Sequence, residues 1–298
     1  MVVRLFDRIC PLLFLLAWSS GAIVVKLGIQ DASVWSFLAL RSAGAFVLFS
    51  VACRMRLGSF GPALLSGVSG PLIGKVVLCG IAMQIAYQSF FFLSLDAGLS
   101  PGILAIVLGL QPMLMPVIAR EKLGVFRYFI LLAGFAGLVM VVLASMEVQI
   151  VPAAGLAFAG ISVLAMGVGT TLQSRIDVSP LVSAWLHSAI AGAVFVAVAS
   201  IDGWRFEATG EFVACLVWMT AVVSVGATLL LFHLLSVGKA AGVGVLFYLV
   251  PIVTLALDVL IFDVEISDLV LMGCSVVAVS VYLFRRLDFP GRENSSKT

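Results

Sequence analysis

Long apolar runs alternate with short charged loops along the whole chain. An α-helix needs about 20 apolar residues to cross about 30 Å of hydrocarbon, and lipid excludes backbone without internal hydrogen bonds. Ten runs reach this length, at approximately 10–29, 34–54, 74–94, 98–119, 125–145, 153–173, 180–200, 212–236, 240–262 and 266–285. Prolines are favoured in the first turn of a helix, and four stand near predicted helix starts: Pro11, Pro101, Pro152 and Pro180. The pattern predicts an all-α integral membrane protein of ten transmembrane helices.

The charged loops fall into two sets when they are assigned alternately to the two sides of a membrane. The set that contains the N-terminus holds Arg4, Arg8, Arg54, Arg56, Lys75, Arg120, Lys122, Arg127, Arg175, Lys239, Arg285, Arg286, Arg292 and Lys297. The other set holds Arg205 and many acidic residues, among them Asp31, Asp96, Glu147, Asp202, Glu207, Glu211, Asp263, Glu265 and Asp268. Because loops rich in Lys and Arg stay in the cytoplasm, both termini are predicted to be cytoplasmic.

The two halves of the chain are related by an internal repeat. Leu99-Ser100-Pro101-Gly102 leading to Leu110-Gln111-Pro112 parallels Gly238-Lys239-Ala240-Ala241 leading to Leu249-Val250-Pro251. An acidic residue, Glu121 or Glu265, and a last span follow each block. Five spans per half is an odd number, so the second copy enters the membrane in the opposite direction. We predict inverted repeats at residues 1–149 and 150–286, followed by a polar cytoplasmic tail at 287–298.

Composition narrows the classes of function. Hydrophobic residues make up 62% of the 298 residues and charged residues 11%, so lipid is expected to cover most of the surface. The net charge of +2 is too small to indicate a nucleic-acid partner. The five cysteines show no CxxC spacing, and neither a metal site nor a disulfide framework is expected.

Ionisable side chains inside a span are costly and are therefore candidates for function. Arg41 lies about two helical turns into the second span, where we expect it to face a cavity or to bond carbonyl groups. The repeat alignment sets His187 against it. His187 either exchanges a proton that couples transport or is a neutral histidine bonded between helices. Asp258, in the ninth span, either pairs with Lys26 or Arg41 as a proton site or is a simple interfacial carboxylate.

The third span carries the most polar helix face. Its side chains at i, i+3, i+4 and i+7 are Gln84, Tyr87, Gln88 and Phe91. Amides and a phenol facing lipid would lack hydrogen-bond partners, so this face is expected to line a cavity or to bond another helix.

Further candidates lie near the predicted midplane. Gln111 beside Pro112 and Tyr248 near Pro251 form matched positions in the two repeats. A proline inside a helix removes a hydrogen bond and frees a carbonyl, so Pro112 and Pro251 are expected to kink their helices, either beside the substrate or for packing alone. Trp18, well inside the first span, either stacks on a substrate or packs in the core.

The sequence resembles the EamA domain of the drug/metabolite transporter (DMT) superfamily. The likeness rests on Trp18 to Gly28 and Phe37 to Arg41 in the first two spans, and on the proline blocks from Leu95 to Pro112 and Val237 to Pro251. It covers nearly the whole chain as two EamA repeats. The resemblance implies a multi-pass protein of the bacterial inner membrane that exports small metabolites, amino acids or toxic compounds, and it names no substrate.

Three functional hypotheses follow. The first is a secondary transporter that works by alternating access, with protons as a candidate coupling ion, no cofactor, and the lipid bilayer and a small organic substrate as its partners. The other two are an intramembrane enzyme and a non-transporting scaffold. The chain contains no GxxxxGK[ST], HExxH or GxSxG motif, so neither ATP-driven transport nor enzyme activity is expected.

Overall fold

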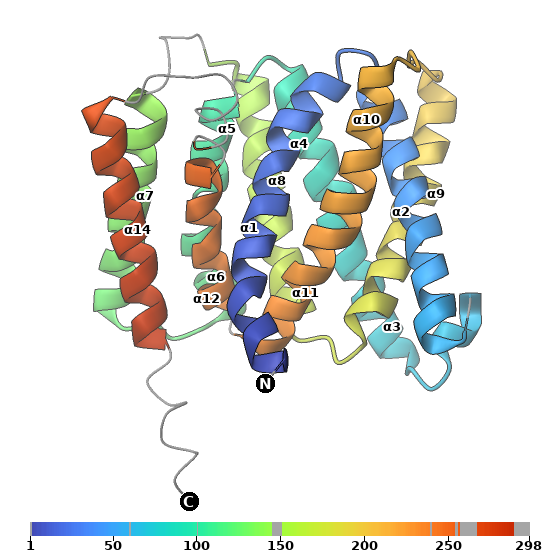
Figure 1. The fold of residues 1–298 in the computed structure, drawn as a ribbon, viewed down its shortest axis with the longest axis horizontal. Helices are drawn as coiled ribbons and strands as arrows, with labels where there is room; N and C mark the ends of the chain where they lie inside the picture. The colour runs from blue at the N-terminus through green and yellow to red at the C-terminus, as the bar shows by residue number, and fades with distance from the viewer. Residues whose placement is uncertain are drawn as a thin grey trace, which may run out of the picture.

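A computed structural model describes residues 2–59, 61–99, 101–144, 151–238, 240–253, 256 and 267–288, and these form a bundle of helices (Figure 1). The first half contains α1 (Val2–Gly28), α2 (Val34–Leu57), the short 3₁₀ turn η1 (Gly61–Leu65), a span from Gly70 to Asp96, a span at 101–119 and α7 (Val125–Ala144). The second half contains α8 (Ala153–Gln173), α9 (Pro180–Asp202), a span from Gly210 to Val237, a span that begins at Ala240, and α14 (Asp268–Asp288). The predicted all-α fold is confirmed.

Among the described residues, seven helices are long and apolar enough to cross a membrane. Three shorter apolar helices, Ile9–Val25, Ile103–Ala119 and Ala240–Val253, coincide with the other three predicted spans. Ten spans therefore fit the structure. The proposed boundary between the repeats falls within 145–150, and most of the predicted tail within 289–298; both lie outside the described residues.

Three of the four proline boundaries are confirmed, and the first is wrong. Pro101 and Pro180 stand in the first turns of their helices, and Pro152 is the residue before α8. By contrast, α1 begins at Val2 and runs through Pro11. The proline frees only the carbonyl of residue 7, near the start of the helix and the end of the bundle, so the helix continues across it.

The packing of the helices repeats itself between the two halves. α2 packs along α9, and α7 packs along α14, and these are the second and fifth spans of each half. The third span contacts α8, just as the eighth span contacts α1. When the two halves are exchanged, the α2–α9 and α7–α14 contacts map onto themselves, and the contact of the third span with α8 maps onto that of the eighth span with α1. A two-fold relation between the repeats produces this pattern. α1 begins and α14 ends at the same end of the bundle, called the termini end below (Figure 1).

Two spans contain a turn of π-helix, in which the hydrogen bond joins residues i and i+5. In the third span α3 (Gly70–Gly80) leads through η2 (Ile81–Ala86) to α4 (Tyr87–Asp96). In the eighth span α10 (Gly210–Trp218) leads through η3 (Met219–Ala227) to α11 (Thr228–Val237). These are equivalent spans of the two halves, so the same irregularity occurs twice at related positions. Such π segments are found frequently at functional sites.

The fourth and ninth spans are also interrupted at related positions. In the fourth, α5 (Pro101–Leu108) ends before the turn at Gly109-Leu110, and α6 (Gln111–Ala119) follows. In the ninth, α12 (Ala240–Gly244) passes into the 3₁₀ turn η4 (Val245–Tyr248). Pro112 and Pro251 stand directly after these interruptions. A proline clashes with the carbonyl four residues earlier, which lies at Leu108 and Phe247, so each break falls where the proline removes a bond.

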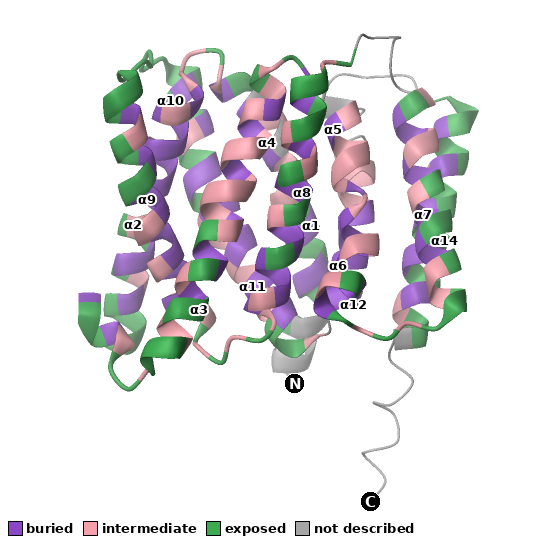
Figure 2. Cartoon of the chain, turned by 180° about the vertical axis from the view of Figure 1, so that it is seen from behind, coloured by how far each residue is buried: buried purple, intermediate pink, exposed green. Residues whose placement is uncertain are grey.

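Large apolar side chains are exposed on the outer faces of the bundle (Figure 2). On α2 they include Val47, Val51 and Met55, and on α7 they include Phe126 and Phe129. Exposed apolar surface of this extent is not stable in water, and it is what hydrocarbon chains cover in a membrane.

Close packing of α7 against α14 depends on small residues. A Cβ atom at Gly137 would lie 2.9 Å from the carbonyl oxygen of Gly273 and 3.0 Å from Cβ of Val276. Small residues let two membrane helices approach in this way. We expect Gly137→Leu to force the helices apart and to destabilise the protein by about 1–3 kcal/mol. Gly160→Leu on α8, where nothing lies within 4 Å of the added Cβ, is the control. The melting midpoints of the two purified variants are measured in detergent. Equal midpoints would contradict the close contact between α7 and α14.

Candidate functional site

A central cavity of about 510 Å³ lies where the helices of the two halves meet. Its size is within the range of about 300–1,000 Å³ found for small-molecule sites. Side chains from both halves line it, and the polar and aromatic ones are Trp18, Arg41, Gln84, Tyr87, Gln88, Phe91, Phe92, Gln111, Thr228 and Phe247. The first six predicted cavity residues, Trp18 to Gln111 in this set, therefore share one space.

Aromatic rings form one side of this cavity. The rings of Trp18 and Tyr87 stack with centroids 6.5 Å apart, and the ring of Phe247 meets Trp18 edge-on at 5.7 Å. Phe91 continues the wall, 5.8 Å from Tyr87. Trp18 belongs to α1, Tyr87 to α4 and Phe247 to η4, so the wall joins the first repeat to the second.

Arg41 supplies a charge to the cavity. Its side chain is 7% exposed, and its Nε donates a hydrogen bond to Oγ of Ser224 at 2.6 Å. Ser224 is part of η3. Among the described residues, no carboxylate forms an ion pair with the guanidinium, and no second hydrogen bond to it is found. Arginine stays protonated in proteins, so its positive charge is held beside the cavity by a single neutral hydroxyl.

Carboxamide groups provide the neutral polar part of the lining. Nε2 of Gln88 donates to Oε1 of Gln84, one turn earlier across the end of η2. Oε1 of Gln88 is buried without a hydrogen-bond partner among the described residues. Gln111 is almost fully buried, and its Nε2 contacts the sulfur of Met115 at 3.8 Å. A buried acceptor without a partner is rare in proteins and costs about 1–3 kcal/mol.

The two π segments take part in the lining. Met83 and Gln84 come from η2, and Met219 and Val223 come from η3. Hydropathy did not indicate them, because the widened turn changes neither the length nor the apolar character of the span. The polar spacing of Gln84, Tyr87, Gln88 and Phe91 did indicate the face of the third span, and all four line the cavity.

Two predicted cavity residues, His187 and Tyr248, do not line this cavity. His187 is fully buried between helices, with Nε2 2.9 Å from the carbonyl oxygen of Val76 and its ring edge-on to Phe232. Gly80 makes room for it, because a Cβ there would lie 2.7 Å from Cδ2 of His187. His187 therefore fills the contact of α9 with α3, and proton coupling through it stays a prediction.

Tyr248 is the second of these residues. Its hydroxyl donates to the carbonyl oxygen of Leu131 at 2.9 Å, and its ring is fully buried against α7. The 3₁₀ turn η4 explains the difference, because three residues per turn rotate Tyr248 away from the face expected for an α-helix. Pro251 lines the cavity, whereas Pro112 does not. Asp258 lies outside the described residues.

The cavity runs from Met166 and Leu231, inside the bundle, to the end opposite the termini end. It reaches Ile29 of the loop after α1, Leu95 near the end of α4 and Val142 near the end of α7. Toward the termini end a cluster of buried side chains fills the bundle, and it includes Phe14, Phe49, Met115, Phe232, Leu235 and Leu246. In this conformation the termini end is closed by packed apolar side chains.

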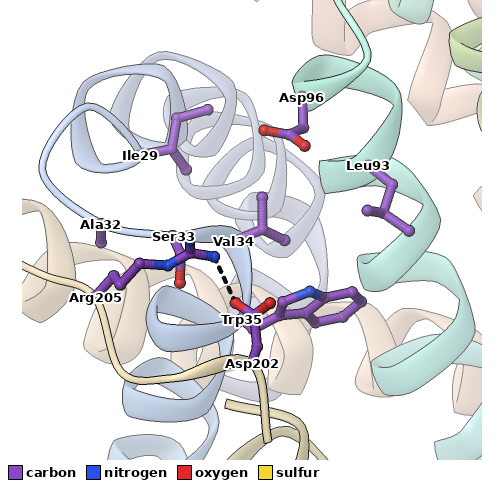
Figure 3. A pocket seen from close by; sticks show the side chains of 9 residues that line it. All are labelled: Ile29, Ala32, Ser33, Val34, Trp35, Leu93, Asp96, Asp202 and Arg205. Carbon is purple, nitrogen blue, oxygen red and sulfur yellow. Dashed lines mark hydrogen bonds and ion pairs between the residues drawn. The ribbon is translucent and has the colours of Figure 1, made fainter.

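A second cavity, of about 490 Å³, lies at the far end of the bundle (Figure 3). Asp96, Trp35 and the ion pair between Arg205 and Asp202, 2.7 Å apart, surround it. Ile29 lines both cavities, so the second one adjoins the central cavity at its far end. The adjoining loops are fixed to each other, because N–H of Ser33 donates to the carbonyl of Arg205 at 2.8 Å.

Comparison with known proteins gives a family match for the second half of the chain and a fold match for nearly the whole chain. Residues 153–286 match the EamA-like transporter family. The crystal structure of another protein superposes on this chain with a TM-score of 0.76, and the match covers 94% of this chain and 97% of that chain at 18% identity. At that identity the likeness concerns the fold alone. A search of curated proteins finds no match.

Proposed function

We propose that this chain, which belongs to the EamA-like transporter family through the domain at residues 153–286, is a secondary transporter that exports small organic solutes. The observation that carries the proposal is the central cavity, which both halves line, with a buried cation and amides from the first half and aromatic rings from both. Binding sites of secondary transporters lie at such places, between repeats and beside interrupted helices.

Alternating access is the proposed mechanism. The present arrangement, with a cavity that reaches the end opposite the termini end and packed side chains at the termini end, supports an outward-facing state. The two-fold pattern of contacts supports a second state in which the packing at the two ends is exchanged. The related interruptions at η2 and η3, and at Pro112 and Pro251, supply backbone with fewer regular hydrogen bonds on the path of that change.

The proposed orientation has the termini end in the cytoplasm of a bacterial inner membrane. Many Lys and Arg residues lie in the loops and helix ends there, and the structure anchors two of them. Arg127 donates to the carbonyl of Leu287 at 2.6 Å, and Arg175 donates to the carbonyl of Ala119. Positive charge at the last carbonyls of a helix is favourable because it meets the negative end of the helix dipole.

We expect a reporter fused after residue 298 to report a cytoplasmic terminus. A fluorescent protein, which folds in the cytoplasm, should be bright at this position, whereas alkaline phosphatase, which needs the periplasm, should be inactive. A fusion in the loop after Asp202 should give the opposite pair of signals. Active phosphatase at the C-terminus would contradict the orientation.

Counterflow tests the transport function itself. Purified protein is reconstituted into liposomes loaded with one unlabelled solute, and uptake of the same solute in labelled form is measured outside. A carrier gives a transient accumulation that protein-free liposomes lack. Solutes are drawn from organic acids, amines, amides and sugars. No counterflow with any class, from protein that melts cooperatively, would contradict a transport function.

A further inference from the structure

We infer that the central cavity selects organic carboxylates that carry an apolar body and a hydrogen-bond donor. This inference rests on the proposed transport function and specifies its substrate class. It follows from the charge, the rings and the unpaired acceptor that line one cavity.

The charge of Arg41 requires an anion. The guanidinium is held by one bond to Ser224, whereas its flat fork of five N–H groups can bind a carboxylate through two parallel hydrogen bonds. Keeping an ion in the membrane interior is expensive, and a cation kept at a cavity is compensated when an anion occupies that cavity. Ser224 fixes Nε and leaves the terminal nitrogens for the ligand.

The rest of the lining disfavours a positively charged ligand. No Asp or Glu is among the described residues that line the cavity, so Arg41 is their single formal charge. An organic cation would meet a like charge there, and no described lining residue would act as its counter-ion. The aromatic wall alone would accept a cation through its ring faces, at about 0.5–2 kcal/mol, but repulsion from an unscreened arginine outweighs that gain.

The aromatic wall defines the second part of the ligand. Trp18, Tyr87, Phe91 and Phe247 present flat apolar surface from three helical segments to the same space. A small inorganic anion would leave this surface in contact with water inside the protein. A carboxylate attached to an apolar body satisfies both the guanidinium and the wall.

Gln88 defines the third part. Its Nε2 is already used by Gln84, and its Oε1 is a buried acceptor without a partner among the described residues, on a side chain that lines the cavity. An O–H or N–H group on the ligand satisfies it. A 2-hydroxy acid therefore fits the cavity better than the corresponding unsubstituted acid.

Matched ligands test this inference in the purified full-length protein. On phenyl, indolyl and isobutyl bodies, the acetic acid, its 2-hydroxy derivative, its primary amide and the corresponding amine are compared for thermal stabilisation in detergent and for counterflow. Acids should bind at least about tenfold more tightly than the amides and amines of the same body, because charge-assisted bonds contribute about 1.5–3 kcal/mol. The 2-hydroxy acids should bind most tightly.

Three variants, at two positions, separate the contributions of the ligand groups. Arg41→Gln should remove the preference for acids over amides, and Arg41→Lys should restore part of it. Gln88→Leu should keep the preference for acids and lose the advantage of the 2-hydroxy acids. If amines or amides bind more tightly than acids, or if no acid binds, the inference is overturned. Counterflow of an amine or a sugar would then leave the transport function standing, whereas no counterflow of any class would remove both.

Discussion

The Ala105→Trp variant is expected to lose transport while it remains folded. Ala105 lies on α5 and lines the central cavity from the side of the fourth span. A tryptophan there projects an indole into space that the substrate needs. Forcing further atoms into occupied space costs about 1–3 kcal/mol, so apparent affinity should fall by about tenfold or more.

The same substitution at a lipid-facing position is the control for Ala105→Trp. Ala157 is exposed on α8 and does not line the cavity, and Ala157→Trp should transport like the unmodified protein. Both variants are compared at equal amounts in liposomes, after melting shows that each is folded. Unchanged transport by Ala105→Trp would show that substrate does not pass through this cavity.

Deletion of Ala86 is expected to abolish transport and to preserve the fold. In η2 the N–H of Tyr87 bonds the carbonyl of Ala82, five residues earlier. Removing one residue between them turns this bond into an ordinary i to i−4 bond, so α3 and α4 keep their relative orientation. Met83 and Gln84 are lost from their places in the lining. Transport should fall to the level of empty liposomes, with a melting midpoint equal to or above that of the intact chain.

Deletion of Gly160 provides the contrast. α8 is a continuous α-helix, so a deletion rotates everything beyond it by about 100°. Ser162 would turn away from the carbonyl of Tyr87, to which it donates, buried residues further along the helix such as Thr170 would turn out of the core, and the protein should lose cooperative melting. If deletion of Ala86 is as damaging to the fold as deletion of Gly160, or if it leaves transport intact, the role given to η2 is wrong.

The spans could be predicted from the sequence because lipid imposes length and apolar character on every one of them. The start of α1 could not, since a proline inside the first turns is compatible with a longer helix when the freed carbonyl lies near the bundle end. The π turns η2 and η3 were also missed. They depend on the hydrogen bonds of single turns, and hydropathy averages over many turns.

The candidate site was predictable where polar side chains follow a helical period. Gln84, Tyr87 and Gln88 line one cavity because lipid cannot satisfy them. His187 could be assigned no place by this reasoning, because a histidine bonded to a carbonyl and one facing water look the same in sequence. Tyr248 was misplaced because the 3₁₀ turn that rotates it has no signature in the residue pattern.

The central claim is that the packed termini end must open during each transport cycle. There α6 and α12 meet at Met115 and Gly244, where an added Cβ on Gly244 would lie 3.6 Å from Cβ of Met115. This separation is within the range of about 3.5–4.5 Å that a disulfide requires. With the five native cysteines replaced by alanine, Met115→Cys and Gly244→Cys together should form a bond that holds the two helices closed.

A second pair gives the control for this disulfide. Gly134→Cys and Ser280→Cys join α7 to α14, which pack along their length and need not separate. Their Cβ atoms would lie 3.2 Å apart on the present backbone, so a small outward adjustment brings them into the range of a disulfide. Counterflow is measured for both pairs after oxidation and again after reduction. Oxidation is expected to stop transport by the Met115 and Gly244 pair, reduction is expected to restore it, and the control pair is expected to transport in both states. Equal transport by the oxidised and reduced Met115 and Gly244 pair, with the disulfide shown to be complete, would contradict alternating access through this cavity.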